Sequence, residues 1–508
     1  MNVGFLLEIA AEGMPDRIAV GSRHEGVTYA RLLAQAQRAA RVVSSTAGGD
    51  VPPERLAMLD LNSPMLPVLL FGAAFAGVPF VPMNYRLADD RLRDLVARNA
   101  PALLVVDPPV MERLAEVPGI DVVSRAEFAE RLEREPSHAD LAPAGDADEE
   151  IAVLLFTSGT TGPPKAAVLR NRHLTSYILS TSEFGSADES EATLVSVPPY
   201  HVAGVSAILS AVYAGRRLVY LPAFSAADWV AAARDEEVTH AMVVPTMLGR
   251  ILDELEATGT RLPALAHLSY GGGPMPAPVI ERAMGLLPHV NFVNAYGLTE
   301  TSSTISILTP DDHREAARSA DPAVRARLGS VGRPLPTLEL EVRDPFGEPL
   351  PVGNVGEVWV RGEQVAGEYL GAGDRDRSEG WFPTRDSGFL DAEGYLFLAG
   401  RLDDVIVRGG ENISPGEIEE VLLQHPGVEE VAVVGVQDVQ WGERVVAYVV
   451  AHGGATVTEA ELQGHVRTKL RSTCTPEQVH FLGELPYSDT GKLLRRVLRA
   501  KALEGADV

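Results

Sequence analysis

Short apolar runs rich in aliphatic and β-branched residues alternate with amphipathic helical patterns through the first two-thirds of the chain. The run RLAMLDL at 55–61 precedes a helical stretch at 64–76, and RLVYLP at 217–222 precedes the helical stretch AADWVAAARDEEV at 226–238. Strands and helices that alternate in this way build parallel sheets covered by helices. We therefore predict an α/β fold with a large N-terminal domain of mostly parallel sheets, whose ligand site lies at the carboxyl ends of the strands.

The pattern changes near residue 335. Alternating strands with tight turns follow at 338–344, 356–362 and 394–401, which predicts a small β-rich subdomain. After Arg401 the sequence predicts a compact α+β unit: a helix, two hairpin-like strands, a second helix, and a final strand, loop and helix. We place a domain boundary at 400–404, which gives an N-terminal domain of residues 1–400 and a small C-terminal domain of residues 401–508.

Length and charge limit the classes of function. A chain of 508 residues is too long for one ordinary core. Its formal net charge of −26 argues against binding to nucleic acid or to anionic membranes, and a site for a phosphorylated ligand must supply its own positive field. The single cysteine, Cys474, permits no intrachain disulfide and no cysteine-based zinc site. The N-terminus lacks the basic region of a signal peptide, so we expect a cytoplasmic protein.

One segment without any charge, residues 61–85, is long enough to suggest a membrane span. It contains four prolines, and Gly77 divides it into two parts. We interpret it as a buried helix that ends near Gly77, followed by a short buried strand in VPFVPM, so we expect no membrane span.

The loop TSGTTGPPK at 157–165 follows an apolar run and has the composition of an anion-binding loop. Glycines let backbone N–H groups turn toward an anion, hydroxyl groups add donors, and a lysine adds a full charge. It is not a Walker A loop, because Pro164 precedes Lys165 and Ala166 follows it. The alternative is a polar surface loop, which the apolar flanks disfavour. The candidate phosphate-binding residues are Thr157, Ser158, Gly159, Thr160, Thr161, Gly162 and Lys165.

The stretch LLFTSGTTGPPKAAV resembles the phosphate loop of the acyl-adenylate-forming superfamily, which comprises acyl-CoA synthetases, adenylation domains of peptide synthetases and firefly-type luciferases. Further resemblances follow in the expected order: VPPYHVAG (197–204), YGGGPMP (270–276), NAYGLTET (294–301), a long stretch at 380–419, and LPYSDTGK (485–492). The resemblance implies a reaction in two halves. A carboxylate attacks the α-phosphate of ATP to give an acyl-adenylate and pyrophosphate, and a thiol such as that of CoA then displaces AMP.

The resemblance also implies roles for individual residues. Lys492, Glu300 and Thr299 are catalytic: Lys492 reaches the carboxylate and the α-phosphate, Glu300 holds Mg²⁺, and Thr299 bonds a phosphate oxygen. Tyr296 offers a face for adenine, although packing in the core is the alternative for its ring. Asp386 and Arg401 are the expected ribose ligands.

Other expected contacts fall into three sets. The nucleotide set adds Gly272, Gly273, Pro274, Asn294, Ala295 and Gly297. The acid pocket is lined by His201, Val202, Gly204, Val205 and Gly271, and the alternative for His201 is a satisfied core histidine. The mobile C-terminal lid domain swings about Asp403 between the two half-reactions and brings Gly409 and Gly410 to a pantetheine tunnel.

The sequence departs from the family pattern at Arg385, which stands where glycine is common, in Thr-Arg-Asp at 384–386. Arg385 either faces solvent or touches a phosphate of a ligand. Ala166 is a second departure, and one methyl group should be tolerated there.

The leading interpretation is an ATP-dependent acyl-CoA synthetase for a fatty or aryl monocarboxylic acid, with ATP, Mg²⁺ and CoA as cofactors or co-substrates and a role such as fatty acid metabolism. No lysine or arginine occurs in the pocket stretches, which favours an apolar tail over a dicarboxylate. A second interpretation is a free-standing adenylating enzyme that loads a carrier protein. A third is a nucleotide-binding regulatory protein without turnover. A homodimer is an option that the sequence leaves open.

Overall fold

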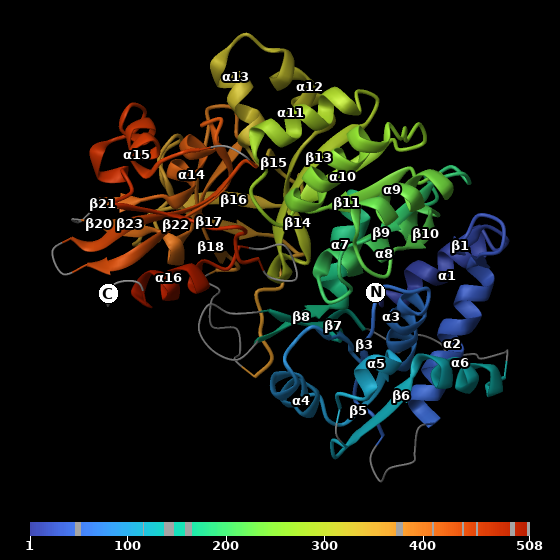
Figure 1. Cartoon of the computed structure of the whole chain (residues 1–508). Coiled ribbons are helices and arrows are strands. Elements are labelled where there is room, and N and C mark those ends of the chain that lie inside the picture. Colours follow the sequence, from blue (N-terminus) through green and yellow to red (C-terminus); the bar gives the residue numbers. More distant parts are fainter. Residues whose placement is uncertain are drawn as a thin grey trace.

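The structure is a computed structural model of the chain, and Figure 1 shows its arrangement. It describes residues 1–45, 52–114, 116–136, 147–157, 165–371, 379–408, 411–438, 441–453, 456–487 and 493–504.

Two mostly parallel sheets form the body of the large domain. Within the described residues, the first has the strand order β15-β14-β13-β12-β11-β9-β10-β1-β2 and the second has the order β6-β5-β3-β4-β7-β8. The first sheet contains β1 (Ile18–Val20), β2 (Val27–Thr28), β9 (Ala192–Val195), β10 (Arg217–Tyr220), β11 (His240–Val243), β12 (His267–Gly271), β13 (Asn291–Leu298), β14 (Ser303–Leu308) and β15 (Arg333–Pro334). The second contains β3 (Leu56–Leu59), β4 (Phe80–Pro82), β5 (Ala102–Val106), β6 (Ile120–Ser124), β7 (Ile151–Thr157) and β8 (Lys165–Arg170). The α/β prediction is therefore confirmed.

Helices pack on these sheets and between them. One continuous core joins the apolar faces of α1 (Gly4–Gly13), α2 (Tyr29–Ser45), α3 (Met65–Ala76) and α8 (Val202–Ala214) to strands of both sheets. The remaining helices of this part are α4 (Asp89–Ala97), α5 (Pro108–Met111), α6 (Arg125–Arg134), α7 (Asn171–Thr181), α9 (Ala226–Asp235), α10 (Pro245–Thr258), α11 (Ala277–Leu286), α12 (Pro310–Arg318) and α13 (Pro322–Ala326).

The segment without charge forms the buried helix and strand that the sequence predicts. From Leu66 to Phe75, α3 is buried without interruption, so it needs no polar face. Gly77 ends the helix in the left-handed conformation with φ 68°, which glycine adopts without strain. In the part of the chain that the structure describes, no helix is both long and apolar enough to cross a membrane.

A third sheet is antiparallel and has the order β16-β17-β18-β19. Its strands are β16 (Glu339–Arg343), β17 (Gly356–Arg361), β18 (Phe382–Leu390) and β19 (Leu396–Arg401). The predicted β-rich subdomain is thus confirmed. The chain leaves this sheet through the short helix η4 (Leu402–Asp404).

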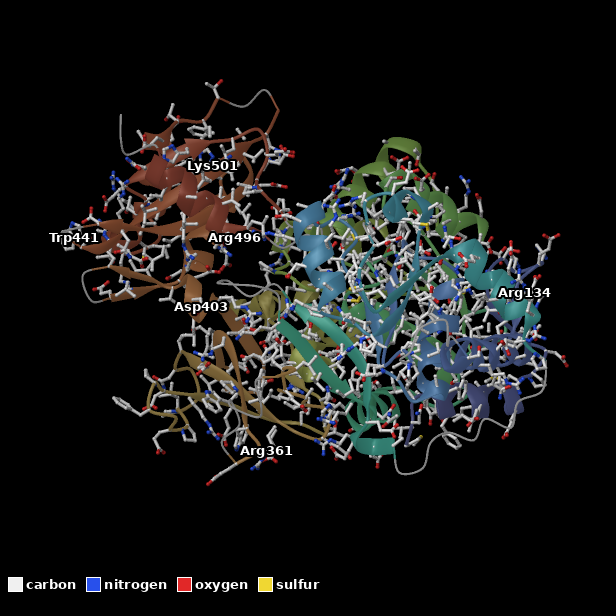
Figure 2. All side chains as sticks on the ribbon, turned by 90° about the horizontal axis from the view of Figure 1, so that it is seen from below. Arg134, Arg361, Asp403, Trp441, Arg496 and Lys501 are labelled. Carbon is white, nitrogen blue, oxygen red and sulfur yellow. The ribbon has the colours of Figure 1, made fainter. Side chains whose placement is uncertain are left out.

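The C-terminal region forms a fourth sheet with helices on it, as predicted. Strands β20 (Ile406–Arg408), β21 (Glu411–Ile413), β22 (Val428–Asp438), β23 (Gly442–Ala451) and β24 (Gln478–Phe481) make the sheet, and α14 (Pro415–Leu423), α15 (Glu459–Arg467) and α16 (Arg495–Glu504) pack on it. Figure 2 shows Asp403 where this small unit meets the third sheet. The exact domain limits, 1–400 and 401–508, stay a prediction.

Candidate functional site

The carboxyl ends of β12 and β13 bring two of the glycine-rich motifs side by side. These strands are parallel neighbours, and Gly271 lies opposite Ala295. A Cβ atom at Gly271 would lie 2.2 Å from the carbonyl oxygen of Ala295, so only glycine allows this approach. Gly272 follows with φ 80° and turns the chain away from the sheet. At the same edge, Asn294 is fixed because its Nδ2 donates to the carbonyl oxygen of Ser330 at 3.0 Å.

Tyr296, Asp386 and Arg401 form a cluster that joins the first and third sheets. The hydroxyl of Tyr296 donates to Oδ2 of Asp386 at 2.5 Å, and Nε of Arg401 lies 2.8 Å from Oδ1. Asp386 and Arg401 meet because they are directly opposed in β18 and β19. Burial first, and then the charge of Asp386, raise the pKa of Tyr296 well above its usual value, so its phenol stays a hydrogen-bond donor.

The ring of Tyr296 is mostly buried, at 9% exposure, and packs against Ile305 and Phe382 in a hydrophobic cluster. Its packing in the core and its bond to Asp386 are therefore the observed contacts. The stacking of adenine on this ring stays a prediction, as do the ribose roles of Asp386 and Arg401.

A second cluster joins Lys165 and Glu300 through Tyr369. The Nζ atom of Lys165 lies 5.3 Å from the centre of the Tyr369 ring, within cation–π range, and the Tyr369 hydroxyl donates to Oε1 of Glu300. The backbone fixes this geometry, because Tyr369 bridges to Ala167 in β8 while Ala366 and Gly367 donate to the carbonyl oxygen of Glu300 at 2.8 and 3.0 Å. Tyr369 lies outside every motif that carries the resemblance.

Glu300 suits the magnesium role that the resemblance implies. Its Oε2 atom has no hydrogen-bond partner among the described residues, so one carboxylate oxygen is available to a hard cation. Among the described residues, no three or more His, Cys, Asp or Glu side chains form a group that could hold a metal ion. Mg²⁺ at Glu300 would take its other ligands from phosphate and water oxygens, which is how Mg²⁺ is commonly bound beside nucleotides. Thr299 begins the short helix η2 (Thr299–Thr301) next to it.

The acid-pocket motif lies next to this second cluster. His201 is the N-cap of α8, Gly204 is buried in the first turn, and its Cβ would lie 3.2 Å from the carbonyl oxygen of Pro198. The hydroxyl oxygens of Ser206 in α8 and Ser303 lie 3.2 Å apart. Only Ser302 separates Ser303 from the end of η2. The start of α8 is therefore close to the Glu300 segment. Whether His201, Val202, Val205 and Gly271 touch an acid stays a prediction.

Arg385 keeps a backbone shape typical of glycine. It has φ 63° and an exposed side chain, between the buried residues Thr384 and Asp386. Thr384 fixes the turn, because its hydroxyl donates to the carbonyl oxygen of Val358 at 2.8 Å and accepts from the Asp386 amide at 3.1 Å. The side chain of Arg385 makes no hydrogen bond or ion pair with another described residue.

Several predicted site residues lie outside the described part of the chain. The ends of the predicted phosphate loop are described: Thr157 and Lys165 face each other as the last residue of β7 and the first residue of β8. Asp403 lies in η4. The residues outside are Ser158, Gly159, Thr160, Thr161, Gly162, Gly409, Gly410 and Lys492.

Comparison with known families gives two matches. A family described as AMP-binding enzyme matches residues 7–370, and a family described as AMP-binding enzyme C-terminal domain matches residues 417–492. The matched ranges include the predicted phosphate loop, both clusters except Asp386 and Arg401, and Lys492.

Relatives and solved structures give the same kind of match. The chain is 33% identical over 507 residues to fatty acid–[acyl-carrier-protein] ligase ScoC of Streptomyces coeruleorubidus, covering 96% of this chain and 94% of that protein. It is 32% identical over 499 residues to feruloyl-CoA synthase of an Amycolatopsis species, covering 95% and 96%. The o-succinylbenzoate CoA synthetase of Bacillus subtilis with its acyl-adenylate intermediate matches with a TM-score of 0.82 and 28% identity, over 97% of both chains.

Proposed function

The chain belongs to the AMP-binding enzyme family and is an AMP-forming acid–thiol ligase, and we propose that it joins a fatty or aryl monocarboxylic acid to the thiol of CoA at the expense of ATP. The observation that best supports this proposal is the pair of clusters at the carboxyl end of one strand, β13. The Tyr296–Asp386–Arg401 cluster suits a nucleoside, and the Lys165–Tyr369–Glu300 cluster suits a polyphosphate with its cation.

In this proposal Asp386 accepts hydrogen bonds from ribose hydroxyl groups. Its two oxygens are already held by Tyr296 and Arg401, so the carboxylate is oriented before the nucleotide arrives. Preorganisation of this kind reduces the entropy that binding costs. The backbone of 271–273, which only glycine can form at Gly271, brings N–H and C=O groups to the adenine and acyl side of the same site.

Adenylation concentrates negative charge around the α-phosphate. Lys165 brings a positive charge to the β- and γ-phosphates, and Lys492 brings one to the attacking carboxylate and the α-phosphate. Bound Mg²⁺ would neutralise phosphate charge at Glu300. Fixed charges in a site that excludes water stabilise such a transition state more strongly than they would in water. The small domain then swings about Asp403 and Lys492 leaves. The pantetheine thiol loses its proton and attacks the acyl carbon beside Gly409 and Gly410, the acyl–phosphate bond breaks, and AMP leaves.

The second candidate acceptor is the pantetheine arm of a carrier protein. The observation that favours it is the 33% identity to the fatty acid–[acyl-carrier-protein] ligase. The acid, the acceptor, a homodimeric state and a cytoplasmic location all stay predictions.

The test is acid-dependent pyrophosphate release with Mg-ATP. The acids are short, medium and long fatty acids and benzoate- and cinnamate-type acids, each with and without CoA. We expect release with one class of acid, faster with CoA and accompanied by the thioester. Release that CoA does not accelerate would favour the carrier protein, and no release with any acid would contradict the proposal.

The catalytic assignment has its own control pair. Lys492→Ala should lower pyrophosphate release about 100-fold to 1,000-fold, which is the range for loss of one group that stabilises transition-state charge. Lys501→Ala removes another lysine from the same terminal stretch, an exposed one in α16, and should change nothing. Unchanged release in Lys492→Ala would refute the role of this lysine.

A further inference from the structure

Two carboxylates and two arginines form one ion-pair network where three segments of the small domain meet. Asp404 ends η4, Glu419 lies in α14, and Arg495 and Arg499 lie one turn apart in α16. The Nη2 atom of Arg495 lies 2.5 and 2.7 Å from the two carboxylate oxygens of Glu419. The Nη2 atom of Arg499 lies 2.9 Å from Oδ1 of Asp404, and Arg495 lies 3.8 Å from its Oδ2. The network thus links the segment after the predicted pivot to the start of the last helix.

The pair of Glu419 and Arg495 is shielded and anchored to the backbone. Their side chains are only 12% and 20% exposed. The amide of Val433 in β22 donates to Oε1 of Glu419 at 2.7 Å, and its carbonyl oxygen accepts from Nε of Arg495 at 3.3 Å. Nη2 contacts both carboxylate oxygens and Nε donates to the backbone, so the planar guanidinium is held at two of its nitrogens, and its orientation is fixed. Arg495, the first residue of α16, is therefore held in place against α14 and β22.

Arg495 also lies three residues after the end of the short stretch 488–492, and both sides of this stretch are held. Tyr487 and Leu493 form an antiparallel bridge, and the Leu494 amide donates to the carbonyl oxygen of Pro486 at 2.8 Å. Residues 488–492 lie outside the described part of the chain. The flank on the C-terminal side is fixed by the bridge and, two residues later, by the contact between Arg495 and Glu419.

We propose that Glu419 and Arg495 are positioning residues for adenylation. They hold the C-terminal flank of the stretch that carries Lys492 at a fixed place, and the contact between Asp404 and Arg499 links this flank to the pivot. This inference rests on the proposed function, in which Lys492 acts in the first half-reaction and leaves before the second. A displacement of about 1 Å at a reacting group can cost about 100-fold in rate. Residues that act only through Lys492 should therefore affect one half-reaction and spare the other.

The experiment measures the two half-reactions separately in the full chain. Pyrophosphate release reports adenylation, and thioester formation from a synthetic acyl-adenylate and CoA, without ATP, reports the second half. For Arg495→Gln and Glu419→Gln we expect pyrophosphate release to fall about tenfold to 100-fold in kcat, with KM for ATP and thioester formation changed less than about threefold. Arg495→Lys keeps the charge but loses the Nε donor to the Val433 carbonyl oxygen and the Nη1 contact to Asp404, so it should give a smaller split.

The matched control is Tyr448→Phe. The Tyr448 hydroxyl donates to the carbonyl oxygen of Leu498 in the middle of α16 at 2.9 Å, so its loss weakens the docking of the same helix away from residues 488–492. We expect equal small changes in both half-reactions. An equal fall of both rates in Arg495→Gln, or the same split in Tyr448→Phe, overturns the inference.

Lys492→Ala, measured beside these variants, separates this inference from the proposed function. Unchanged pyrophosphate release in Lys492→Ala would contradict the role of Lys492 itself. Loss of release in Lys492→Ala together with no split in Arg495→Gln would overturn only the positioning role.

Discussion

The bond between Tyr296 and Asp386 gives a prediction whose size follows from the structure. Tyr296→Phe removes one hydroxyl and keeps the ring that packs against Ile305 and Phe382. The lost bond is 2.5 Å long, runs to a carboxylate that is 6% exposed, and belongs to the class of hydrogen bonds to charged groups that contribute about 1.5–3 kcal/mol. Because about 1.4 kcal/mol corresponds to a factor of ten, full transfer of this loss to ligand binding weakens AMP affinity about tenfold to 100-fold.

Isothermal titration calorimetry with AMP is the assay. AMP avoids turnover and contains the ribose that Asp386 is proposed to bind. The control is Tyr29→Phe, whose hydroxyl donates to the carbonyl oxygen of Arg216 at 3.0 Å and whose side chain is fully buried. Tyr29→Phe should lower stability by about 0.5–1.5 kcal/mol, as for a neutral hydrogen bond, and leave AMP affinity unchanged.

A second background makes the prediction specific. If the hydroxyl of Tyr296 acts by orienting Asp386, Tyr296→Phe should change AMP affinity by less than about threefold when Asp386 is already alanine. An equal loss in both backgrounds would refute the reasoning, because the hydroxyl would then act on the nucleotide by another route. Unchanged affinity in the single variant would contradict the orienting role of the Tyr296 hydroxyl, because Arg401 would then suffice to hold Asp386.

Three further predictions concern backbone shape and pH. Arg385→Gly should raise the free energy of unfolding by about 0.5–1 kcal/mol in urea titrations, because φ 63° strains an arginine and not a glycine; Arg385→Ala should not. Gly297→Ala should destabilise the chain by about 3 kcal/mol, since its Cβ would lie 1.8 Å from the carbonyl oxygen of Ser303. Gly285→Ala in α11, with open space around it, should be neutral or stabilising. Similar free energies of unfolding for the two variants would contradict this reasoning. Burial, and then the nearby positive charge of Arg216, lower the pKa of His240 to about 3, so its unfolded form takes up a proton below pH 6.5 while the folded form does not. The stabilisation that comes from neutral His240 is complete above pH 6.5, and its loss should lower the free energy of unfolding by about 2 kcal/mol when the pH falls to 5. His240→Gln should remove this part of the pH dependence of unfolding. An unchanged slope of the free energy of unfolding against pH in His240→Gln would contradict the prediction.

The elements were predictable where a local pattern determines them. The alternation of strands and helices, the uncharged helix that ends at Gly77, and the antiparallel strands after residue 335 each follow from residue spacing and from glycine chemistry. Local patterns do not determine which distant segments meet. The link between Lys165 and Glu300 depends on Tyr369, which reaches both only because residues 366–370 lie along β8 and η2.

The ion-pair network of the small domain was hidden for the same reason. Glu419 and Arg495 are 76 residues apart in sequence, and each looks like an ordinary charged residue of a surface helix. Their meaning appears only when α14 and α16 are both placed on β22. A contact of this kind needs the tertiary fold, whereas a glycine turn needs only its neighbours.

Arg385 in Thr-Arg-Asp at 384–386 shows that this motif requires a backbone shape and not a particular residue. Glycine is common in the family where Arg385 stands, which suggests that the position needs a backbone with positive φ. The structure keeps that backbone with an arginine, because the Thr384 side chain holds both the carbonyl oxygen of Val358 and the amide of Asp386. Strain of about 1 kcal/mol is small against the contacts that fix the turn. The turn directs Asp386 inward to Tyr296 and Arg401, so the site depends on the shape of the chain at this position and tolerates a side chain that points away from the cluster.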